Sequence, residues 1–208
     1  MQDKIIRDLR SVFSDHSFTE TTLTGTPLLI YETNGKNSEG YSIKFTVITH
    51  EESELRSFEI INREKGNKIT HICIDGDFIP YGQEKYDSKN SKWKDGRPDC
   101  MVFDDNTFLF LELKLEQEDT TFGKENTKWN KFFEGANQIL DFVNFQRTRG
   151  FDIQDYYSQI NAIICMRFDP NFSIKSRGNS ARNSERAKVS QKLGFEILAQ
   201  NYFEFKSD

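Results

Sequence analysis

The chain has 208 residues, a length that suits one domain with a sizeable core, and its 19 phenylalanines supply bulky side chains for that core. Its 28 basic and 33 acidic residues give a formal net charge of −5, which argues against a protein that coats nucleic acid nonspecifically but leaves room for a local basic surface. Since no run of about 18 apolar residues occurs, we expect no membrane span and no membrane partner.

The first half of the chain predicts one helix followed by several strands. Apolar residues at helical spacing predict an amphipathic helix at 3–13. Polar or glycine-containing turns then separate four extended runs, at 28–32, 41–49, 56–63 and 68–74. We interpret these runs as an antiparallel meander, inserted at about residues 22–78. The alternative is a separate small sheet packed on the core. The polar stretch at 78–96 is interpreted as an insertion rather than a substrate-facing flap.

Two short apolar strands around a polar turn are the most informative feature of the chain. The pattern predicts a β-hairpin that pairs Phe103 with Phe108. Counting outward in that register, Asp99 lies opposite Glu112 on the same face, with the two Cβ atoms about 4.5–5.5 Å apart. Because side chains alternate along a strand, Lys114 points to this face as well.

This geometry is unfavourable for a purely structural sheet, because like charges directly across a strand pair repel each other. A divalent cation removes the repulsion, and two carboxylates with water or phosphate oxygens form a shell that Mg²⁺ accepts. Lys114 could then hold a phosphate oxygen or orient an attacking water. The alternative is a hairpin in which Arg97, Lys114 or backbone groups satisfy the two acids separately.

The second half of the chain predicts alternating helices and strands. Its elements are a helix at 126–147 with an apolar stripe, a strand at 160–167, a helix at 181–193, and strands at 194–198 and 202–205. Together with the first half, this order predicts a mixed α/β (α+β) fold in which helices flank a central sheet.

A basic segment overlaps the start of the second of these helices. Residues 171–192 include six basic residues and one acidic residue. Because a helix N-terminus flanked by arginines favours anions, we expect Arg177, Arg182 and Lys188 to contact the phosphates of a nucleic acid. A solvated helix face is an equally open interpretation.

Pro98–Asp99, twelve intervening residues and Glu112–Lys114 together resemble the motif of the PD-(D/E)XK nuclease superfamily. The resemblance covers residues 97–208. It implies a restriction-endonuclease-like core of αβββαβ topology, with a mixed central sheet flanked by helices and the strands of residues 22–78 inserted. We therefore expect one nuclease-like domain over the whole chain.

The resemblance also implies roles for individual residues. Asp99 and Glu112 would bind Mg²⁺, together with the carbonyl of Leu113, and Mn²⁺ would substitute. Lys114 would position the water or stabilise charge. In several branches of the family, a helical glutamine with a tyrosine four residues later approaches the active site, which implies a catalytic role for Gln138.

Two features depart from the resembled family. Phe142 stands where the tyrosine would follow Gln138, which keeps open the alternative of a helix-surface glutamine. Many relatives also carry a further acid on the first core helix, and four residues are candidates here: Asp3, Asp8, Asp15 and Glu20.

The predicted function is that of a Mg²⁺-dependent endonuclease or phosphodiesterase, a hydrolase that cuts DNA or RNA by means of a metal-activated water. The expected partner is a nucleic acid, DNA ahead of RNA. The alternative is a catalytically inactive nuclease-like scaffold that binds a nucleic acid or a protein. The resemblance leaves a homodimer open. Cys73, Cys100 and Cys165 each lie in an apolar run without a CxxC motif, so we expect buried thiols and a cytoplasmic location.

Overall fold

The computed structural model describes most of the chain: residues 1–13, 19–36, 42–51, 57–74, 86–87, 92–93, 96–114, 125–166 and 180–206. The helices of this part are α1 (Gln2–Val12), α2 (Glu125–Thr148), the short 3-10 helix η2 (Ile153–Asp155) and α3 (Ser180–Leu193). They confirm the three predicted α-helices to within one residue at each end. None of the described helices combines the length and the apolar character needed to cross a bilayer.

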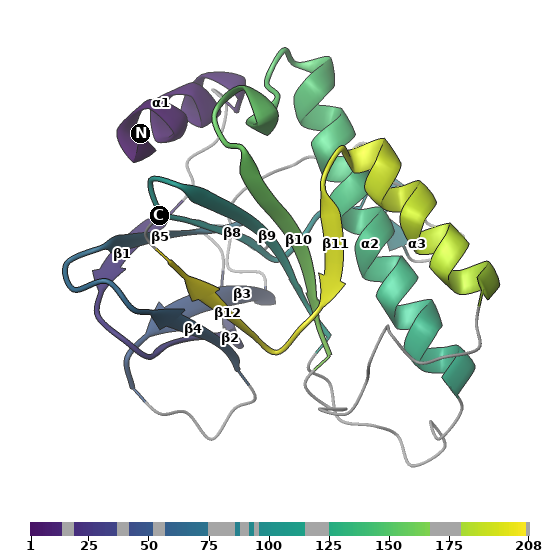
Figure 1. Ribbon diagram of the computed structural model, residues 1–208, viewed down its shortest axis with the longest axis horizontal. Helices are drawn as coiled ribbons and strands as arrows, with labels where there is room; N and C mark the ends of the chain where they lie inside the picture. The colour runs from purple at the N-terminus through teal and green to yellow at the C-terminus, as the bar shows by residue number, and fades with distance from the viewer. Residues whose placement is uncertain are drawn as a thin grey trace.

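The main sheet has six strands in the order β1-β5-β8-β9-β10-β11 (Figure 1). The strands are β1 (Glu20–Thr24), β5 (Lys68–Cys73), β8 (Cys100–Phe103), β9 (Thr107–Leu113), β10 (Gln159–Cys165) and β11 (Glu196–Ala199). The pairs β1–β5, β5–β8 and β8–β9 are antiparallel, and β9, β10 and β11 run parallel to one another. The helices α2 and α3, which supply the connections between the parallel strands, lie side by side on one face of this sheet.

The second sheet has four strands in the order β12-β4-β2-β3. They are β2 (Leu28–Lys36), β3 (Ser42–Thr49), β4 (Phe58–Asn62) and β12 (Tyr202–Phe205). β12 runs parallel to β4, whereas β4, β2 and β3 are antiparallel. The last strand of the chain therefore returns to a sheet that is otherwise built from the first third of the sequence.

The alternation of side chains along β9 divides the core into two layers. Phe108 and Phe110 pack with residues of all three α-helices. Leu109 and Leu111 pack with residues of the second sheet. All seven residues of β9 are buried, as expected for a central strand with both faces covered.

The predicted antiparallel meander is confirmed for the pairing of β2 with β3 and is wrong for the other strands. β4 pairs with β2 instead of β3, and β5 belongs to the main sheet, between β1 and β8. Five of the six residues of β5 are buried, and a strand buried on both faces belongs inside a layered fold rather than at the end of a meander. The separate-sheet alternative holds only for β2, β3 and β4. Strand β1 was not expected.

A short pair of strands lies within the segment predicted as an insertion. β6 (Tyr86–Asp87) and β7 (Lys92–Trp93) pair antiparallel. Apart from these two strands and residue 96, the stretch 78–96 lies outside the described residues.

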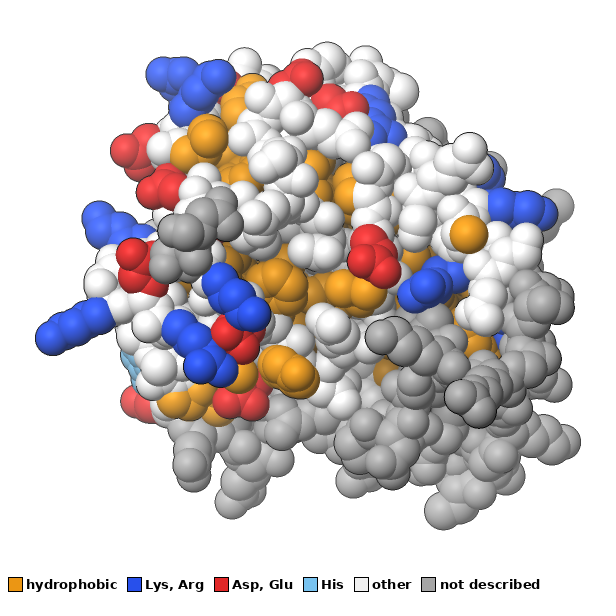
Figure 2. All heavy atoms as spheres, in the orientation of Figure 1, with side chains coloured by type: hydrophobic (Ala, Val, Ile, Leu, Met, Phe, Trp, Pro, Cys, Tyr) orange, Lys and Arg blue, Asp and Glu red, His pale blue; other side chains and the backbone are white. Residues whose placement is uncertain are grey.

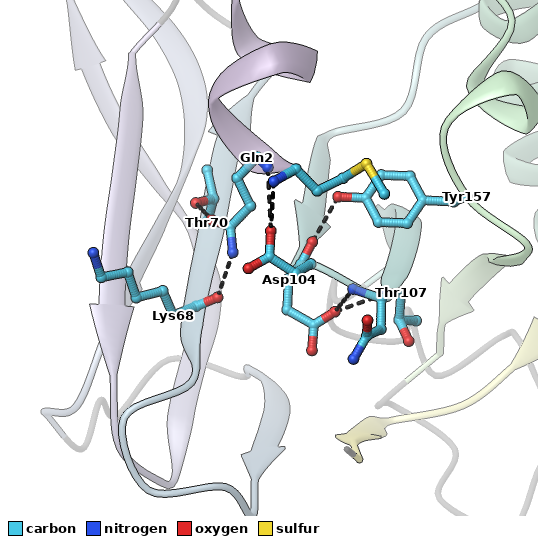
Figure 3. Close-up of polar contacts among 9 residues, drawn as sticks. Gln2, Lys68, Thr70, Asp104, Thr107 and Tyr157 are labelled. Atoms are coloured by element: carbon cyan, nitrogen blue, oxygen red, sulfur yellow. Dashed lines mark hydrogen bonds and ion pairs between the residues drawn. The ribbon is translucent and has the colours of Figure 1, made fainter. Parts of the chain in front are cut away.

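The turn between β8 and β9 is closed by its own first side chain. Asp104 Oδ1 accepts hydrogen bonds from the backbone amides of Asn106 and Thr107, at 2.8 and 2.7 Å. The Tyr157 hydroxyl donates to the Asp104 carbonyl at 2.6 Å (Figure 3). An aspartate that bonds the amides two and three residues later fixes a tight turn, and the turn fixes the register of the hairpin.

The N-terminus of α1 lies at this same end of the sheet. The Met1 amine is 3.1 Å from a carboxylate oxygen of Asp105, and Gln2 Nε2 donates to the Lys68 carbonyl at 3.0 Å. Figure 3 shows Gln2 between Lys68, Thr70 and the turn at Asp104. The first helix is thus joined to the turn end of the hairpin, opposite to the end that carries Glu112.

Candidate active site

The two acids of the hairpin lie opposite each other, as the sequence predicts. β8 and β9 pair Phe103 with Phe108 and Cys100 with Leu111, and one step further along the same register sets Asp99 against Glu112. Their side chains are on the helix-covered face and are nearly buried, with 8% of Asp99 and 2% of Glu112 exposed. Two adjacent buried carboxylates repel each other unless a positive charge compensates them.

Asp99 is held between its two neighbouring strands. Its carbonyl accepts the amide of Ile74 at 2.9 Å, which extends the pairing of β8 with β5. On the other side, its carboxylate oxygen Oδ2 accepts the backbone amide of Leu113. Asp99 is therefore fixed by the backbone of both β5 and β9.

Lys114 follows directly after β9 and completes the charged group. Its amine is 2.7 Å from Glu112 Oε1 and donates a 2.9 Å hydrogen bond to Gln138 Oε1. Burial disfavours the charged amine, but the Glu112 carboxylate outweighs that effect, and the pKa of Lys114 is raised above its ordinary value. Lys114 therefore stays protonated at neutral pH.

The helix α2 supplies the wall of the site. Gln138, half-buried, accepts from Lys114 and donates through Nε2 to the Arg97 carbonyl at 3.2 Å. Asp141, one turn later, accepts the Gly96 amide at 3.4 Å. Gln138 thus lies partly exposed on the surface of α2 and contacts the segments on both sides of the hairpin.

Two glycines allow this helix to approach the site. A Cβ atom on Gly135 would lie 2.9 Å from Glu112 Cγ, and one on Gly96 would lie 2.5 Å from Gln138 Cα. Both distances are shorter than a normal carbon contact, so a larger residue at either position would force a neighbour to move. Sequence reasoning overlooked both residues and Asp141. The one available signal was a glycine in the middle of a long helix, which costs about 1 kcal/mol and therefore often has a packing reason.

Three of the four acids proposed for the first helix lie in the described residues, and none of these three reaches this site. Asp8 accepts a 2.8 Å hydrogen bond from Tyr156, and Glu20 pairs with Arg10 at 3.1 Å. Tyr156 lies just before the start of β10, and the start of β10 pairs with the start of β9. That end of β9 is about 16 Å along the strand from Glu112. Asp3 is exposed in the first turn of α1, and Asp15 lies outside the described residues.

Two of the three predicted phosphate-binding residues, Arg182 and Lys188, are described by the structure, and they lie on different sides of α3. The Arg182 guanidinium lies over the Trp129 ring of α2, 5.4 Å from its centroid. Lys188 is exposed six residues later on α3, which places it about 120° around the helix from Arg182. Arg177 lies outside the described residues. On the face drawn in Figure 2, the described lysines and arginines are scattered among acidic side chains and form no continuous basic surface.

The oxygen atoms at the end of the hairpin fit a hard divalent cation. Asp99 and Glu112 offer carboxylates, and the N–H and C=O of Leu113 both face β8, because main-chain groups of one residue point to the same side of a strand. Carboxylate and carbonyl oxygens suit Mg²⁺ or Mn²⁺ better than softer metals. Among the described residues, however, no group of three or more histidine, cysteine, aspartate or glutamate side chains forms a metal cluster.

Comparisons of the chain with known protein families, with curated proteins and with solved structures give no match. Fold and site together define a mixed α/β protein with two mixed sheets and a buried cluster of two carboxylates and one amine at one end of the main sheet.

Proposed function

We propose that the chain is a metal-dependent nuclease that hydrolyses phosphodiester bonds of DNA or RNA. The observation that carries the proposal is the alignment of Asp99 with Glu112 on one face of the hairpin, with the Lys114 amine 2.7 Å from Glu112. This is the arrangement that the resemblance to PD-(D/E)XK nucleases requires of its three polar residues.

The order of the elements around the hairpin supports the same proposal. α1, β5, β8, β9, α2 and β10 follow each other as helix, three antiparallel strands, helix and a strand parallel to the third. This is the αβββαβ order of the resembled core. β1 to β4 stand between its first helix and first strand, so they occupy the place of an insertion.

The residues of the site suggest a division of labour. Asp99, Glu112 and the Leu113 carbonyl would hold Mg²⁺, and the chemistry that the ion supplies is activation of water and neutralisation of charge on the phosphate. Lys114 is a donor rather than a base, because its raised pKa keeps it protonated. It would hold an oxygen of the phosphate or of the water, while Gln138 fixes the direction of its amine.

The experiment compares two isosteric changes at opposite ends of the same hairpin. Glu112→Gln removes a buried carboxylate of the site, and Asp105→Asn removes a carboxylate at the exposed turn. Each protein is incubated with duplex and single-stranded DNA and RNA in Mg²⁺ or Mn²⁺, and Mn²⁺ binding is measured by calorimetry. We expect Asp105→Asn to cut and bind like the wild type and Glu112→Gln to do neither. Equal cleavage by Glu112→Gln would contradict the proposal.

One observation favours the second candidate, an inactive nuclease-like scaffold. The Lys114 amine already compensates Glu112, and no third acidic ligand is found among the described residues. A scaffold of this kind would bind a nucleic acid or a protein partner without cutting. Mn²⁺ binding that Asp99→Asn abolishes, without cleavage of any substrate of the panel, would favour the scaffold over the enzyme.

A further inference from the structure

Two cysteines lie directly opposite each other next to the site. Cys73 of β5 pairs with Cys100 of β8 in an antiparallel ladder. Because the Ile74 amide donates to the Asp99 carbonyl, Ile74 and Asp99 form a hydrogen-bonded pair, and Cys73 and Cys100 form the adjacent non-hydrogen-bonded pair. The Cα atoms of such a pair are about 4.5 Å apart, within the range of about 4.4–6.8 Å that a disulfide requires.

Both thiols face the layer between the two sheets. Cys100 is fully buried in the cluster that the second sheet covers, and directly opposite residues of a ladder share a face. The backbone amide of Thr46, in β3 of the second sheet, lies 3.4 Å from the Cys73 sulfur. Cys73 retains 8% exposure, so it is the more accessible of the two.

The burial of the pair sets its reactivity. Cys100 is fully buried, whereas Cys73 retains some exposure, so an oxidant from solvent reaches Cys73 first. The first oxidation step therefore belongs to Cys73, and Cys100 is the thiol directly opposite it.

We propose that Cys73 and Cys100 are an oxidisable pair that closes a reversible disulfide between β5 and β8 when the protein meets hydrogen peroxide. Peroxide transfers one oxygen to Cys73 and gives a sulfenic acid and water. The Cys100 sulfur then attacks the Cys73 sulfur, and the S–OH bond breaks with release of a second water. Two thiols are oxidised and one peroxide is reduced in total.

The disulfide would also alter the neighbouring acid. The Cβ atoms of the pair, about 4.5–5.5 Å apart in the ladder, must approach to about 3.5–4.5 Å. Asp99 directly precedes Cys100 and bonds to Ile74, the residue after Cys73. The two strands therefore move against each other where they hold Asp99. This second consequence rests on the proposed function, whereas the disulfide itself does not.

The test begins with the wild-type protein, oxidised with peroxide and then alkylated after unfolding. We expect a mass lower by about two hydrogens, two fewer alkylated cysteines and a peptide that joins Cys73 to Cys100. A reducing agent should reverse all three changes. Cys165→Ala, the matched variant of the third buried cysteine, should still form the bond, and Cys73→Ala should not. Recovery of both cysteines as alkylated thiols from the oxidised wild type would overturn the proposal.

Calorimetry then separates this inference from the proposed function. If both hold, the reduced protein binds Mn²⁺ and the oxidised protein binds it about tenfold more weakly, a loss typical of disturbed outer-shell contacts. If the reduced protein binds no Mn²⁺, the proposed function fails. The disulfide is still demonstrated by the mass of the oxidised protein. Equal Mn²⁺ affinity of reduced and fully cross-linked protein would overturn the coupling to Asp99.

Discussion

The amine of Lys114 and the side-chain amide of Gln138 meet in a 2.9 Å hydrogen bond that joins the end of β9 to the middle of α2. Gln138 Nε2 also donates a 3.2 Å hydrogen bond to the carbonyl of Arg97, which lies two residues before Asp99. One side chain of the helix therefore contacts the residues that flank both strands of the hairpin at the end where the acids lie. This makes Gln138 a positioning residue for Lys114 in the proposed enzyme.

Gln138→Ala should lower kcat of the proposed nuclease about 10- to 100-fold, with little change in KM. A hydrogen bond to a charged group contributes about 1.5–3 kcal/mol, and without it the Lys114 amine loses its orientation. The measurement is steady-state cleavage of a labelled substrate. Asn137→Ala, an exposed neighbour on α2, should behave like the wild type. An unchanged kcat in Gln138→Ala would show that Lys114 needs no such support.

The register of the hairpin could be predicted because its determinants are local. Asp104 closes the turn with bonds to residues two and three positions later, and the apolar alternation of β9 fixes which face is buried. Asp99 and Glu112 could therefore be aligned by counting outward from Phe103 and Phe108.

The pairings of β4 and β12 in the second sheet could not be predicted in the same way, because neither strand pairs with the one that precedes it in the chain. β12 pairs with β4 across more than 140 residues, so that Tyr202 lies beside Glu59. No turn connects these strands and no local pattern indicates the partner. The contacts of Gln138 were likewise invisible, since they depend on how closely Gly135 and Gly96 let α2 approach the sheet.

Gly135→Ala should destabilise the protein, although alanine is the better helix former by about 1 kcal/mol. The added methyl group would lie 2.9 Å from Glu112 Cγ and 3.0 Å from Ile164 Cδ1, so that the helix or the acid must move. Overpacking of this kind costs about 1–3 kcal/mol. Urea unfolding measures the loss. Asn144→Ala, at an exposed position of the same helix, serves as the control and should be neutral or slightly stabilising.

Arg147→Met should lower the free energy of unfolding by about 2 kcal/mol, because several charge-assisted hydrogen bonds are lost at a partly exposed site. The Arg147 guanidinium bonds Asp152 at 2.8 Å and the Leu193 carbonyl at 2.7 Å, and so connects the end of α2 to the end of α3. Arg147→Lys should recover less than half of the loss, since an ammonium group cannot reach both partners as the planar guanidinium does. Urea unfolding of both variants, with the exposed Arg7→Met as control, tests this. If Arg147→Lys recovered the full free energy of unfolding, the planar geometry of the guanidinium would have no role in this stabilisation.

A fall in pH should lower the free energy of unfolding through the protonation of His71. This side chain is buried between the sheets, with Nε2 3.0 Å from Thr46 Oγ1, and burial lowers the pKa of His71 to about 4. An unfolded histidine has a pKa of about 6.5. Above that pH neither state binds the proton. As the pH falls from 6.5 toward 4, the unfolded chain binds a proton that the folded protein excludes, so stability is lost over this range.

The comparison of His71→Gln with the wild type isolates this contribution from that of the carboxylates. The wild type should lose about 2.5 kcal/mol more than His71→Gln when urea unfolding is moved from pH 7.5 to pH 4.5, because only the wild type has the shifted histidine. His50→Gln, which changes an exposed histidine, should follow the wild type at both pH values. A difference between wild type and His71→Gln that stays constant with pH would mean that His71 is protonated as easily in the folded protein as in the unfolded chain.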